Sequence, residues 1–139
     1  MIKKIIALCL CLMVSVEAFA FDSDKFYKAV ETYSRLSNRA DELLKEAKET
    51  WKFDAYEKAM DRADEAATVL EKMVNKLRRT KDIEAAKNVV AKFEKESPAN
   101  EPAAKHTMKL IEYRGKFIES HSVFNLFKRD SDNKHTTRQ

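Results

Sequence analysis

The apolar residues of this chain recur at alternating steps of four and three, which is the spacing of one face of an α-helix. The first such run begins at Phe26 and ends at Trp51. Asp22, Ser23 or Asp24 precedes it, where a side-chain oxygen can accept a backbone N–H at the helix start. The sequence therefore predicts a helix with one buried face. That face comprises Phe26, Val30, Tyr33, Leu36, Ser37, Ala40, Leu43, Leu44, Ala47 and Trp51.

A second run, from Tyr56 to Leu77, repeats this spacing out of phase with the first. The change of phase indicates a break, and Asp54 with Glu57 matches a capping box, in which each side chain bonds the other's backbone N–H. We therefore expect two helices. One continuous helix over residues 24–78 is the alternative, because neither Gly nor Pro occurs at the break. Its buried line would follow steps of four through Trp51, Ala55, Ala59, Ala63 and Ala67.

Two further apolar runs predict two more helices. The third helix should open after Thr80 or Asp82 and close before Pro98, with a face made of Ile83, Ala86, Val90 and Phe93. The fourth follows Pro102 and contains Gly115, the chain's sole glycine. Glycine lowers helix stability by about 1 kcal/mol relative to alanine, so we expect close backbone packing there. The apolar positions of the fourth helix are Leu110, Ile111, Phe117, Ile118, Phe124 and Phe127.

These runs define an all-α fold, a small antiparallel bundle of three to four helices over residues 21–127, because no alternating strand pattern occurs. Residues 128–139 contain no apolar side chain and are expected to form a disordered polar tail.

The first twenty residues have the pattern of an export signal. Lys3 and Lys4 precede an apolar run over residues 5–16, and small residues at Ala18 and Ala20 suit a cleavage site. The run is too short to span a bilayer, so no transmembrane segment is expected. We expect cleavage near Phe21 and export to the periplasm or the medium, with a bacterial source favoured. Both cysteines, Cys9 and Cys11, would leave with the signal peptide, so no disulfide is expected.

The charge pattern disfavours nucleic acid as a partner. The 27 basic and 23 acidic residues interleave along the chain and give a net charge of +4, without a clustered basic face. The densest basic group follows the second run. Cations there complement the negative end of a helix dipole, and they also form a candidate docking point for an acidic partner, a lipid head group or an anionic envelope polysaccharide. The candidate residues are Lys72, Lys76, Arg78, Arg79 and Lys81.

The sequence contains no recognisable catalytic apparatus, and we expect no enzymatic activity. A nucleophilic hydroxyl is usually presented on a sharp turn that needs glycine, as are phosphate-binding loops, and this chain has one glycine. His106 and His121 lie fifteen residues apart on one predicted helix, about 22 Å, so they cannot share a metal ion. We expect neither cofactor nor metal. A non-covalent haem or metal carrier, using either histidine with Met60, Met73 or Met108, remains the alternative.

Bulky apolar side chains exceed what one buried stripe per helix can hide. The surplus is expected at Trp51 and Phe53, and again at the end of the fourth helix, where Phe124 and Phe127 are candidate partner-binding residues. The resulting hypothesis is an exported, non-catalytic helical protein that binds another macromolecule, with a protein partner favoured. Self-association and binding to an anionic membrane surface are the other uses of these residues.

Overall fold

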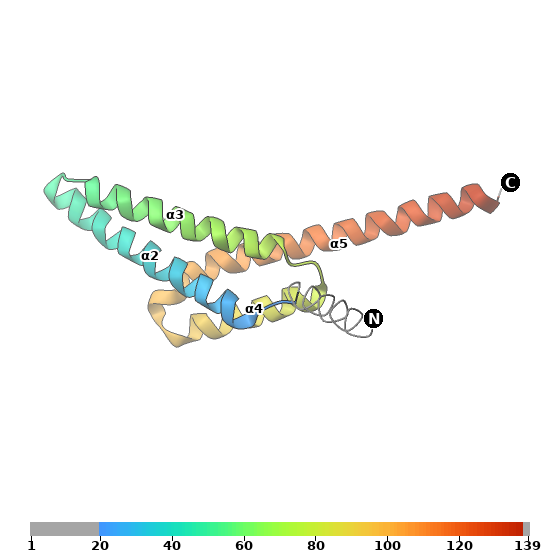
Figure 1. The fold of residues 1–139 in the computed structure, drawn as a ribbon, viewed down its shortest axis with the longest axis horizontal. Coiled ribbons are helices and arrows are strands. Elements are labelled where there is room, and N and C mark those ends of the chain that lie inside the picture. Colours follow the sequence, from blue (N-terminus) through green and yellow to red (C-terminus); the bar gives the residue numbers. More distant parts are fainter. Residues whose placement is uncertain (1–19, 138–139) are drawn as a thin grey trace, which may run out of the picture.

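The computed structural model describes the backbone of residues 20–137 and the side chains of residues 20–121. Its elements are α2 (Ser23–Thr50), α3 (Asp54–Asn75), α4 (Thr80–Glu96), the short 3-10 helix η1 (Pro98–Asn100) and α5 (Glu101–Thr137) (Figure 1). No strand occurs among these residues. The all-α prediction is confirmed, and four α-helices are present in this part of the chain where three to four are predicted.

Helices α2 and α3 form a hairpin, as the two-helix interpretation of residues 24–78 predicts (Figure 1). Asp22 caps α2, because its carboxylate accepts the backbone N–H of Lys25 at 3.1 Å. The expected Asp54–Glu57 capping box is wrong. The N-cap of α3 is Phe53, one residue before the expected cap Asp54, and the Phe53 side chain makes no cap hydrogen bond. Its carbonyl oxygen instead accepts the Glu57 N–H at 2.9 Å.

The connection between α4 and α5 follows its proline signals. Helix α4 ends at Glu96, immediately before Ser97 and Pro98, as predicted. The Asn100 side-chain amide donates to the Phe93 carbonyl oxygen at 2.9 Å and so satisfies one of the last carbonyls of α4. Pro102 occupies the first turn of α5, where a backbone N–H has no partner within the helix.

The hydrophobic core lies where the start of α2, the end of α3, α4 and the start of α5 meet. Every residue of the predicted third face is buried. The two buried polar side chains, Ser34 and Thr107, destabilise the fold little, because each buried side-chain N or O among the described residues has a hydrogen-bond partner. The core comprises Phe26, Val30, Leu70, Val74, Leu77, Ile83, Ala86, Val90, Phe93, Ala103, Ala104 and Ile111.

The connected ends of α2 and α3 project beyond the other helices (Figure 1). Here the two helices bury only small side chains, Ala40, Ala47 and Ala63. Trp51 closes α2 and is 81% exposed, so its predicted place on the buried face is wrong, whereas its exposure agrees with the apolar surplus predicted at this position. Neither α4 nor α5 reaches this end of the hairpin (Figure 1).

Helix α5 differs from its prediction in two respects. Phe117 is 55% exposed, although its spacing placed it on the buried face. A methyl group on Gly115 would meet Ile83 Cγ2 at 3.5 Å, an ordinary contact, so packing here does not require glycine. The backbone of α5 continues to Thr137, and the disorder expected for the polar tail over residues 128–139 stays a prediction. A helix satisfies its own backbone hydrogen bonds, so burial is not a precondition for that conformation.

Candidate functional site: a basic hollow beside the α3–α4 turn

The turn between α3 and α4 carries the predicted basic group, and α5 holds it in place. Helix α3 ends with the Leu77 N–H donating to Val74 O at 3.1 Å. The Leu77 carbonyl then accepts a hydrogen bond from Arg114 Nε of α5 at 2.8 Å. A charged donor thus satisfies a partly buried carbonyl, which fixes the turn relative to the core.

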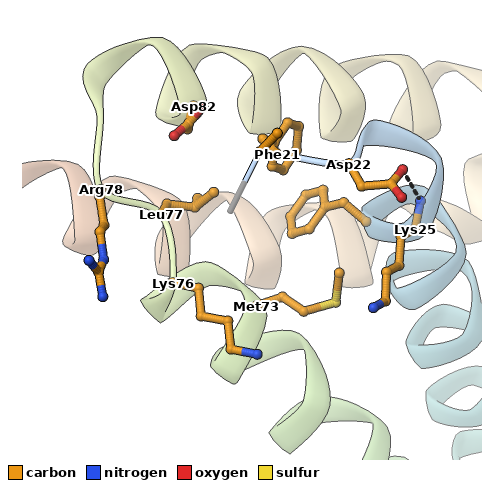
Figure 2. A pocket seen from close by; sticks show the side chains of 10 residues that line it. Phe21, Asp22, Lys25, Met73, Lys76, Leu77, Arg78 and Asp82 are labelled. Carbon is orange, nitrogen blue, oxygen red and sulfur yellow. Dashed lines mark hydrogen bonds between the residues drawn. The ribbon is translucent and has the colours of Figure 1, made fainter. Parts of the chain in front are cut away.

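A hollow of about 520 Å³ opens beside this turn, between the start of α2 and the end of α3 (Figure 2). Phe26 and Leu77 are buried at its base, while Phe21 and Met73 are half-buried. The rings of Phe21 and Phe26 pack with centroids 5.5 Å apart. The other lining residues are Ala20, Asp22, Lys25, Lys76, Arg78 and Asp82.

The charge of this hollow is unbalanced. The lining holds three cations and two carboxylates, a net charge of +1. Asp82 Oδ2 lies 3.4 Å from Arg79 Nε, whereas the Asp22 carboxylate accepts only the neutral backbone N–H of Lys25. Among the described residues, Lys25, Lys76 and Arg78 form no ion pair with a carboxylate. The lysine side chains extend along the rim beside Met73, while Arg78 points away from Phe21 (Figure 2). An apolar base with cations at its edge suits an anionic ligand that also carries apolar groups.

The structure brings together only part of the predicted basic group. Lys76 and Arg78 line the hollow. Arg79 instead contacts Asp82, and Lys81 is exposed outside the lining. Phe124 and Phe127 belong to α5, but their side chains lie outside the described residues.

Sequence reasoning missed Phe21, Lys25 and Met73 as lining residues. A signal for them exists in the predicted topology. In an antiparallel hairpin the first residues of α2 lie beside the last residues of α3, so the basic group had to face residues 21–25. Arg114 was missed as well, because nothing in its local sequence shows that it reaches a carbonyl 37 positions earlier.

A second surface, with exposed aromatic side chains, lies where α3 meets α5. Tyr113 is 71% exposed and Phe117 is 55% exposed. The Arg114 guanidinium lies 5.1 Å from the Phe117 ring centroid, and the His121 ring stacks on Phe117 at 5.4 Å. A hollow of about 360 Å³ follows this surface. Its lining residues are Glu71, Val74, Asn75, Leu110, Tyr113, Arg114 and Phe117.

The residues of the cofactor alternative are not gathered in one place. His106 and His121 are exposed on α5, and the His106 ring lies 5.2 Å from that of Tyr33. Met73 lines the basic hollow, which contains no histidine. Among the described side chains, residues 20–121, no three from His, Cys, Asp or Glu lie close enough together to hold a metal ion.

The shifted pKa values among the described residues arise at two tyrosines and at one ion pair on the surface of α5. A hydrogen bond from the Tyr27 hydroxyl to the Glu96 carboxylate, with burial, raises the pKa of Tyr27 to about 12. Burial also raises the pKa of Tyr33. On the surface of α5, Lys105 Nζ lies 2.7 Å from Glu101 Oε1, which lowers the pKa of Glu101. Tyr27 joins α2 to the end of α4 and is not a lining residue of the hollow.

Comparison of the chain with protein-family models, with curated proteins and with solved structures gave no match. Within the part of the chain that the structure describes, no helix combines the length and apolar character needed to cross a membrane.

Proposed function

We propose that this chain is an exported, non-catalytic helical protein that binds an acidic segment of a partner protein in the basic hollow. The observation that carries the proposal is the combination of an apolar base, formed by Phe26 and Leu77, with the cations of Lys25 and Lys76 at its rim. Such a surface accommodates apolar side chains and compensates neighbouring carboxylates at the same time.

Export rests on the signal-like pattern of residues 1–20. Cleavage after Ala20 would create an ammonium group on Phe21, which lines the hollow, and would add a positive charge to it. Intact-mass measurement of protein from the source cell tests this step. A mature chain beginning at Phe21 in an extracytoplasmic fraction is expected, and a chain that keeps Met1 in the cytoplasm would contradict export.

Binding is tested with a fluorescently labelled peptide of alternating glutamate and leucine, titrated with the protein and followed by anisotropy. We expect saturable binding that weakens as salt is added, because the pairs at the rim are open to solvent. The double variant Lys25→Glu/Lys76→Glu should weaken binding at least about tenfold, since two attractive contacts become repulsive.

The matched control is Lys92→Glu/Lys109→Glu, which changes the net charge equally at exposed positions on α4 and α5. It should keep most of the affinity. Equal losses in both double variants would show that net charge, and not the hollow, binds the peptide. Absence of binding to the unmodified protein would also contradict the proposal.

A further inference from the structure

The turn at the end of the α2–α3 hairpin places a tryptophan where the backbone favours glycine. Trp51 has φ 60° and ψ 22°, and it is the one non-glycine residue with positive φ among the described residues. Its N–H closes α2 by donating to Ala47 O at 2.7 Å. Glycine adopts this left-handed conformation without the steric cost that a bulky side chain incurs. The need to end the helix therefore explains the conformation but not the identity of the residue.

The indole of Trp51 does not stabilise the fold by burial. It is 81% exposed, and the nearby contacts between α2 and α3 are made by small residues such as Ala47 and Ala63. Neither of the two hollows described above is lined by a residue of this turn. A bulky aromatic side chain in a strained, exposed position points to an interaction outside the chain.

We propose that this tip inserts Trp51 into the interface of a lipid bilayer. The turn is the end of a projecting pair of helices (Figure 1). Tryptophan favours the boundary between head groups and acyl chains, where its ring is apolar and its N–H can meet water. Exposed Lys48 and Lys52 flank Trp51 and can contact lipid phosphates, while exposed Glu49 and Asp54 balance their charge, so insertion rests on the indole and on half-buried Phe53 beside it.

This contact is separate from the basic hollow. Helix α2 has 28 residues, so its two ends lie about 42 Å apart at 1.5 Å per residue. The hollow lies at the first end and Trp51 at the second. A negative result for one surface therefore leaves the proposal for the other intact. Together the two surfaces would let the protein hold a partner near a membrane.

The test uses the fluorescence of Trp51, the chain's only tryptophan. Vesicles of phosphatidylcholine with a minor fraction of phosphatidylglycerol are added to the full chain. We expect a blue shift of the emission and quenching by lipids brominated on the acyl chains. The double variant Lys48→Glu/Lys52→Glu should raise the vesicle concentration needed for half of the shift at least about tenfold.

The matched control moves the reporter to another exposed aromatic position. In the variant Trp51→Gly/Tyr113→Trp the indole is on α5, and its emission should not shift with vesicles. An unchanged Trp51 emission at high lipid concentration would overturn the proposal. This result is also expected if Trp51 binds a protein and not a membrane. An equal shift from the α5 position would overturn it too. Lys25→Glu/Lys76→Glu should leave the Trp51 shift intact.

Discussion

Replacing Leu70 by alanine tests whether the core lies where the four helices meet. Leu70 is fully buried near the end of α3, at the centre of the apolar cluster. Removing a buried leucine side chain loses its transfer free energy and leaves a cavity, which together cost about 3 kcal/mol. A domain of this size is typically stable by roughly 5–15 kcal/mol, so the variant should fold but be clearly weakened.

The assay is urea unfolding followed by far-UV circular dichroism, because exposed Trp51 reports poorly on the core. With a urea dependence of about 2 kcal/mol per M, the midpoint of Leu70→Ala should fall by roughly 1.5 M. Val69→Ala is the matched control, since Val69 precedes Leu70 on α3 but is 54% exposed. Its unfolding free energy should change by no more than about 0.5 kcal/mol. Equal midpoints for the two variants would refute the assignment of the core.

Three further predictions follow from single residues. Gly115→Ala should raise the unfolding free energy by roughly 0.5–1 kcal/mol, because the added methyl meets Ile83 at an ordinary distance; a lower urea midpoint would show a clash. Trp51→Gly should stabilise the protein by roughly 1 kcal/mol in thermal unfolding, since glycine relieves the left-handed strain, and destabilisation would mean that the indole packs. Because its pKa is raised, Tyr27 stabilises the fold through its hydrogen bond to Glu96; this stabilisation is complete below pH 10 and is lost as the pH rises towards about 12. The variant Tyr27→Phe should therefore lack this part of the alkaline loss of stability. Identical profiles of unfolding free energy against pH for the two proteins would contradict this prediction.

Helical periodicity predicted which side chains share a face, and it succeeded where another helix covers that face. Ile83, Ala86, Val90 and Phe93 are all buried, because α4 packs against both α2 and α5. The same spacing failed at Trp51. Helix α2 has 28 residues and α4 has 17, so α4 cannot cover the far end of α2. Periodicity contains no information about the length of the covering element.

The candidate site was predictable only for the residues of its own turn. Lys76 and Arg78 stand out as a local basic group, whereas Phe21 and Lys25 join them through the pairing of α2 with α3. The hydrogen bond from Arg114 to Leu77 O depends on how α5 crosses the end of α3, which no local pattern specifies. Sequence thus locates charge, and tertiary packing decides which charges surround an apolar surface.

The most direct measurement of the proposed function is photo-crosslinking in the source cell. A photoreactive amino acid replaces Lys76 at the rim of the hollow in the full chain, and a second protein carries it at exposed Lys92 on α4. We predict one crosslinked partner from position 76, joined through an acidic segment that mass spectrometry can map, and its loss when Lys25→Glu is added. The same product from both positions, or a product that ignores Lys25→Glu, would contradict binding in the basic hollow.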